Sequence, residues 1–138
     1  MFKRIDHIEL LTASPERVIQ FYTQVLGFKV RRRDRVPATP QGPLDLVYLD
    51  LGGTTVELMT YPEAQPSPAP PGERLGYRMM AVEVEDMDGA LALLKAKGVE
   101  PAWGPIRRET YARAEIRDPD GNPIELRQWI SPQNPARS

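Results

Sequence analysis

The chain has 138 residues, of which 41% are apolar and 27% are charged, as in an ordinary globular domain with one core. The formal net charge is −1 and no long block of either sign occurs, which excludes the charge pattern of a protein that binds nucleic acid or a membrane surface. The absence of cysteine excludes disulfides, thiolate metal sites and cysteine nucleophiles.

The first half of the chain predicts one helix among four strands. Alternating residues predict a strand over 3–11. Ser14 followed by Pro15 is typical of a helix start, and the apolar stripe that follows ends at Gly27. Further strands are expected at 28–33, 44–51 and 54–60.

A proline-rich segment, 61–76, predicts a linker because it cannot pack as a regular element. After it the pattern starts again. The expected elements are a strand at 77–85, a helix from Asp86 or Asp88 to Lys97, and strands at 99–103, 110–117 and 122–130. The polar tail, 131–138, is expected to be flexible.

The two halves share one order of elements: a strand, a helix and three strands. This repeat predicts an α+β fold of two βαβββ modules, each with a curved mixed sheet, arranged around a cleft. We expect one domain over residues 1–130. Its modules would span 1–60 and 77–130.

The candidate site residues occupy matching places in this repeat. His7, the only histidine, lies in the first strand, and Glu57 and Glu125 lie in the strands that close the two modules. We hypothesise that these three side chains bind one metal ion. Met79 stands in the second module where His7 stands in the first, and Glu9 and Glu83 are expected to match each other at the solvated surface.

One imidazole and two carboxylates suit a divalent ion such as Ni²⁺, Zn²⁺, Mn²⁺, Co²⁺ or Fe²⁺. Three protein ligands leave coordination positions open, and a bound ion can polarise a carbonyl while Glu57 or Glu125 acts as the catalytic base. The alternative is an ordinary half-exposed strand, in which such glutamates simply face solvent.

Several segments resemble the vicinal oxygen chelate superfamily, which includes glyoxalases, bleomycin resistance proteins and extradiol dioxygenases. They span residues 4–130 and include Ile5-Asp6-His7-Ile8, Phe21-Tyr22-Thr23-Gln24-Val25-Leu26-Gly27-Phe28, Val56-Glu57-Leu58, Ala81-Val82-Glu83-Val84-Glu85-Asp86 and the segment from Asp118 to Leu126. The resemblance implies a glyoxalase-like fold, a divalent metal in the cleft and a homodimer.

In this resemblance, His7, Glu57 and Glu125 match the metal ligands of the family, whereas Met79 replaces its second histidine. A thioether is a weak ligand for these ions, so water or substrate would take the fourth position, or the metal would be lost. Leu11 stands where many glyoxalases carry a glutathione-binding arginine, and a single histidine is too few for an extradiol dioxygenase.

Two functions follow as hypotheses. The first is a metal-dependent lyase or isomerase that chelates neighbouring oxygens of a small carbonyl substrate and moves a proton with a carboxylate. The second is a non-catalytic protein that binds an antibiotic or aromatic ligand between the apolar side chains of Met59, Met79, Trp103, Tyr111 and Trp129. Neither function needs a nucleic acid or a membrane, and a cytoplasmic location is expected because no apolar run suits a membrane span or signal peptide.

Overall fold

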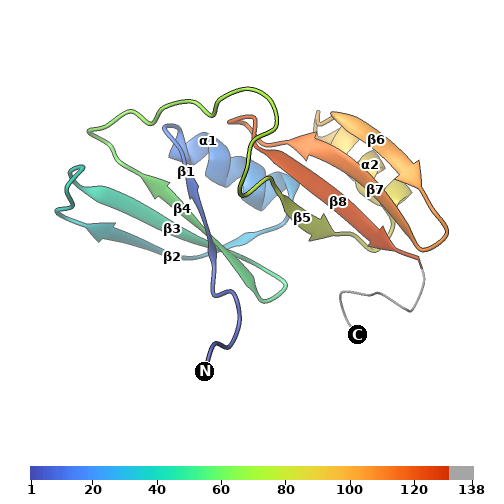
Figure 1. Cartoon of the computed structure of the whole chain (residues 1–138), viewed down its shortest axis with the longest axis horizontal. Coiled ribbons are helices and arrows are strands. Elements are labelled where there is room, and N and C mark those ends of the chain that lie inside the picture. Colours follow the sequence, from blue (N-terminus) through green and yellow to red (C-terminus); the bar gives the residue numbers. More distant parts are fainter. Residues whose placement is uncertain (131–138) are drawn as a thin grey trace. The chain divides into compact units, whose positions relative to one another are not determined.

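The computed structural model describes residues 1–130, so the predicted tail at 131–138 lies outside the described residues (Figure 1). The chain forms two compact units, of which the first covers Met1–Pro71 and the second begins at Gly72. No helix within the described residues is long and apolar enough to cross a bilayer. The single domain over 1–130 and the cleft between the modules stay predictions.

The first unit is a βαβββ module with a four-stranded mixed sheet in the order β1-β4-β3-β2. Strand β1 runs parallel to β4, and the other neighbouring strands are antiparallel. The elements are β1 (Ile8–Leu11), α1 (Pro15–Gln20), a π-helical turn η1 (Phe21–Val25), β2 (Lys29–Val36), β3 (Leu44–Leu51) and β4 (Thr54–Thr60).

The second unit repeats this topology, with a four-stranded sheet in the order β5-β8-β7-β6 and β5 parallel to β8. Its elements are β5 (Met80–Glu83), α2 (Met87–Ala96), β6 (Trp103–Arg107), β7 (Tyr111–Arg117) and β8 (Pro123–Trp129). The predicted α+β fold of two βαβββ modules is therefore confirmed.

One face of each sheet packs against the helix of its own unit. Helix α1 contacts β4 and helix α2 contacts β8. Successive strand residues point to opposite faces, so the buried Val56 and Leu58 alternate with Glu57, and the buried Ile124 and Leu126 alternate with Glu125. Both glutamates therefore lie on the sheet face opposite the buried aliphatic residues.

The strand register aligns the two units residue by residue. Glu9 pairs with Glu57 across β1 and β4, and Ala81 pairs with Glu125 across β5 and β8. Counting back two residues from Glu9 and Ala81 places Met79 at the position of His7, in agreement with the repeat.

The expected match between Glu9 and Glu83 is wrong. Glu83 pairs with Arg127, and its counterpart in the first unit is Leu11, which pairs with Met59. The predicted match pairs Glu9 with a residue two positions too far along the strand of the second unit, because the register makes Ala81 its counterpart. Such a shift preserves the face of every side chain, so alternation alone does not reveal it.

Several element boundaries differ from the prediction. Strand β2 continues to Val36, past the expected end at residue 33, and β5 occupies only Met80–Glu83 of the expected 77–85. The first strand begins only at Ile8, so His7 directly precedes it. The predicted continuous helix widens into η1, where the Thr23 hydroxyl donates to the carbonyl of Ile19 at 2.7 Å and competes with the helical backbone bond. The strand expected at 99–103 lies at Trp103–Arg107, because the Val99 N–H donates to the Leu94 carbonyl at the end of α2.

The turn before β8 is held by one buried carboxylate. Oδ1 of Asp118 accepts hydrogen bonds from the backbone N–H groups of Asp120 and Asn122 at 3.0 and 2.8 Å, and Oδ2 accepts from the Asn122 side-chain amide at 2.9 Å. Asp118 is 4% exposed. Because β8 starts directly after this turn, the carboxylate fixes the entry of the strand that carries Glu125.

We expect Asp118→Ala to lower the free energy of unfolding by about 1–3 kcal/mol, because it leaves two partly buried backbone N–H groups without their acceptor. Asp118→Asn keeps an oxygen for the two backbone donors and is expected to cost less. Urea denaturation of both variants measures the difference. Equal stability of wild type and Asp118→Ala would contradict this account of the turn.

Candidate metal centre

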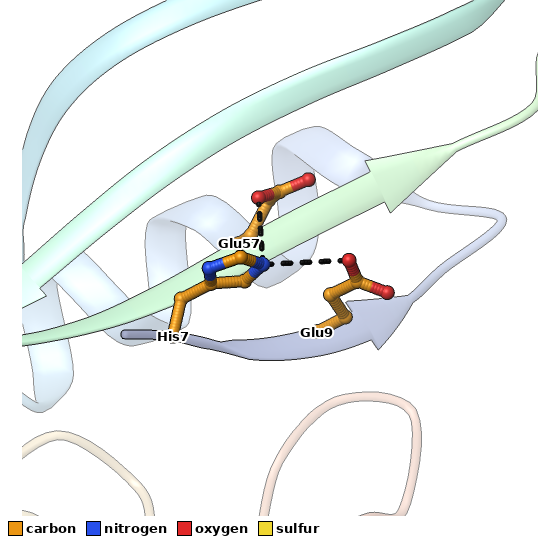
Figure 2. A group of neighbouring side chains, drawn as sticks. All are labelled: His7, Glu9 and Glu57. Atoms are coloured by element: carbon orange, nitrogen blue, oxygen red, sulfur yellow. Dashed lines mark hydrogen bonds and ion pairs between the residues drawn. The ribbon is translucent and has the colours of Figure 1, made fainter. Parts of the chain in front are cut away.

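The parallel pairing of β1 with β4 brings three side chains of the first unit together (Figure 2). His7 Nε2 lies 3.2 Å from Glu57 Oε2 and 3.4 Å from Glu9 Oε1. One ligand atom from each of the three residues lies within 4.8 Å of the other two. Both carboxylates therefore approach the same ring nitrogen of the histidine.

The other ring nitrogen of His7 is held by its neighbour in sequence. Nδ1 lies 3.0 Å from Oδ2 of Asp6. In the neutral imidazole, a proton on Nδ1 donates to Asp6 and leaves the lone pair of Nε2 directed at the two glutamates. This pairing of a carboxylate with a histidine orients the imidazole as metal sites require.

The acidic surroundings change the pKa of His7. Hydrogen bonds to Asp6 and then Glu9 raise the pKa of the imidazole above its ordinary value of 6.5, and the charge of Glu57 adds to the effect. The hydrogen bond with His7 in turn lowers the pKa of Asp6. Without a cation, the cluster therefore favours a proton on His7.

The distances of the histidine nitrogen from the two carboxylates fit a divalent ion. Bonds of about 2.0–2.2 Å from a metal to nitrogen or oxygen place neighbouring ligand atoms about 3.0 Å apart in an octahedral site and about 3.4 Å apart in a tetrahedral site. The separations of Nε2 from the two glutamate oxygens, 3.2 and 3.4 Å, lie close to this range. The side chain of Glu57 is only 10% exposed, whereas that of His7 is 32% exposed and reachable by solutes.

Glu125, the third predicted ligand, has different neighbours within the second unit. Its Oε1 lies 3.0 Å from Nε of Arg113, and its Oε2 lies 2.9 Å from Nε of Arg127. Each carboxylate oxygen is thus next to a guanidinium group. A metal at Glu125 would share these oxygens with both arginines. Met79 is half-buried at the position equivalent to His7, with its sulfur 3.8 Å from Nη1 of Arg78.

Of the predicted ligands, the structure brings His7 and Glu57 together in the first unit, and Glu125 belongs to the second unit. The sequence predicts Glu9 at the solvated surface. Its side chain is 56% exposed, yet it contacts His7. The sequence does contain a signal that Glu9 belongs to the cluster. His7 and Glu9 are two residues apart, and this spacing places both side chains on one face of a strand.

The second sheet carries a cluster of arginine and aromatic side chains on the face of Glu125. The Arg127 guanidinium lies 4.4 Å from the ring centre of Tyr111 and 5.0 Å from that of Trp129. Arg113 lies 4.8 Å from the ring centre of Trp103. We call these five residues the arginine–aromatic cluster. The ion pairs with Glu125 hold both arginines against the rings.

Known proteins are similar to this chain over most of its length. It is 30% identical to the Escherichia coli protein named "Uncharacterized protein YaeR" over 127 residues, 90% of this chain and 95% of the relative. It is 33% identical to a lactoylglutathione lyase of Neisseria meningitidis over 131 residues, 91% of this chain and 90% of the relative. A glyoxalase family protein from Enterococcus faecalis superposes with a TM-score of 0.76 at 28% identity, covering 91% of this chain and 98% of that one.

These similarities agree with the fold of two βαβββ modules. The family model matches residues 4–126, which include both helices and every strand except the end of β8. The chain belongs to the Glyoxalase/Bleomycin resistance protein/Dioxygenase superfamily.

Proposed function

We propose that this protein is a metal-dependent lyase or isomerase of the glyoxalase type that acts on a small carbonyl substrate. His7, Glu57 and Glu125 would hold one divalent ion. The observation that carries the proposal is the approach of the Glu57 carboxylate to His7 Nε2 while Asp6 contacts Nδ1. The similarity to lactoylglutathione lyases supports the reaction type.

A bound divalent ion would polarise the substrate carbonyl and stabilise negative charge on its oxygen. The protein itself must then remove the proton from the hydroxyl-bearing carbon next to that carbonyl and deliver it to the carbonyl carbon. The hydroxyl proton passes to the former carbonyl oxygen, which leaves the atoms and charge of the substrate unchanged overall. Both predicted catalytic residues, Glu57 and Glu125, are carboxylates suited to this transfer.

We favour Glu57 as the group that moves the proton. The oxygens of Glu125 are next to Arg113 and Arg127, which compensate its charge. Among the residues that the structure describes, Glu57 has an ion pair with His7 and none with a lysine or arginine. Its low exposure also keeps water away from the transferred proton.

Protein purified without chelator or affinity tag is expected to contain about one equivalent of a divalent transition metal, as three protein ligands suit an open catalytic site. His7→Ala and Glu57→Gln should each remove the metal, because each deletes a ligand, while circular dichroism stays unchanged. Elemental analysis gives the stoichiometry, and Glu125→Gln tests the third ligand. A wild-type protein that contains no metal and binds none on add-back would refute the proposal.

Metal binding should weaken in acid. The pKa of His7 is raised above 6.5, and a proton on Nε2 competes with the ion. Above the raised pKa of His7, the affinity for the metal should not change with the protonation of this residue. Below that pKa, the affinity should fall by about tenfold per pH unit. Metal titrations at several pH values, together with NMR titration of the single histidine, measure both quantities. A histidine pKa at or below its ordinary value would contradict the electrostatic account.

The arginine–aromatic cluster favours a second candidate function, the non-catalytic binding of an aromatic ligand. Arg127 already lies against Tyr111 and Trp129, so an aromatic compound would find ring and guanidinium surfaces in one place. In a thermal-shift screen, stabilisation by aromatic compounds alone, abolished by Trp129→Ala, is the result expected from this function. Stabilisation by divalent metals that survives Trp129→Ala is expected from the metal-dependent enzyme.

The homodimer implied by the family resemblance also stays a prediction. Exposed apolar side chains on and before β1 fit an interface between two copies. They are Phe2, Ile5, Ile8 and Leu11. Sedimentation equilibrium that shows only monomer at micromolar concentration would reject this arrangement.

A further inference from the structure

We propose that Glu9 is an additional metal ligand, supplied by the same short segment as His7. The proposal rests on the proposed metal-dependent function and extends its ligand set beyond His7, Glu57 and Glu125. Glu9 lies in β1, is the direct register partner of Glu57, and approaches the same ring nitrogen as Glu57 does (Figure 2).

The backbone places Glu9 for this role. Residues two apart in an extended segment point to the same side, so the side chain of Glu9 follows that of His7. Paired residues on neighbouring strands lie about 4.8 Å apart, which brings the carboxylates of Glu9 and Glu57 to the same face of the sheet. The distance of 3.4 Å from Nε2 to Glu9 Oε1 is close to the spacing of neighbouring ligands around a divalent ion.

The composition of the two units supports the same conclusion. In the second unit, Met79 and Ala81 occupy the positions of His7 and Glu9, and neither offers a good ligand for these ions. The first unit therefore offers both an imidazole and an extra carboxylate, while the second offers Glu125 between two arginines. With Glu9, the first unit alone supplies one nitrogen and two oxygen ligands.

A simple ion pair is the competing explanation for the contact between Glu9 and His7. An exposed pair of this kind contributes little to stability and acts only through its charge. A ligand differs because its removal changes both the affinity for the ion and the coordination that the ion adopts.

The test is titration with Co²⁺, whose visible absorption reports its coordination, on wild type, Glu9→Gln and Glu109→Gln. Glu109 is exposed in the turn between β6 and β7 of the other unit, so Glu109→Gln removes the same charge without changing the segment that carries His7. Glu9→Gln should weaken Co²⁺ binding by about tenfold or more and change the spectrum. Glu109→Gln should change neither, and Glu9→His should retain binding with an altered spectrum.

The outcomes separate this proposal from the function on which it rests. If wild type binds Co²⁺, His7→Ala abolishes binding and Glu9→Gln leaves affinity and spectrum unchanged, the Glu9 proposal is overturned and the metal-dependent function stands. Equal weakening in Glu9→Gln and Glu109→Gln also overturns it, because only charge is then involved. If wild type does not bind Co²⁺, both proposals fail together.

Discussion

The parallel pairing of β1 with β4 is the constraint on which the candidate metal centre depends. These strands come from opposite ends of the first module, and β1 has only four residues. The ladder continues past β1, since the Thr12 N–H donates to the Met59 carbonyl at 3.0 Å. Closing such a long loop costs chain entropy, which the burial of helix α1 and the aliphatic side of β4 helps to offset.

The register of this pairing decides the chemistry of the sheet face. With Glu9 opposite Glu57, two carboxylates and the preceding imidazole share one side, while Val56 and Leu58 face the core. A slip of one residue would turn the aliphatic side chains out of the core and the carboxylates into it. The cost of burying those charges makes the observed register the stable one.

The two modules have the same topology but balance charge on their open faces differently. In the first, negative charge gathers around one imidazole, an arrangement that a divalent cation would neutralise. In the second, the carboxylate of Glu125 is already neutralised by Arg113 and Arg127, whose guanidinium groups lie against aromatic rings. The duplicated fold thus carries two unlike surfaces. Because one fold supports many functions, these side chains carry the functional argument.

Local sequence signals predicted most of the elements because those elements depend on neighbouring residues. Ser14 with Pro15 predicted the start of α1, and the alternation of apolar residues predicted β4 and β8. The repeat then predicted the α+β fold and the equivalence of Met79 with His7. The expected strand at 99–103 failed because Val99 takes part in the end of helix α2, a backbone interaction that residue type does not specify.

The sequence by itself determined the two βαβββ modules and two members of the candidate centre, His7 and Glu57, which the structure brings together. Only the tertiary structure decided that Glu9 is at hydrogen-bonding distance from His7 and that both oxygens of Glu125 contact arginines. The physical reason is that strand periodicity fixes the face on which a side chain lies. The neighbours of that side chain come from other strands, and their identity depends on a register set by the packing of the whole module.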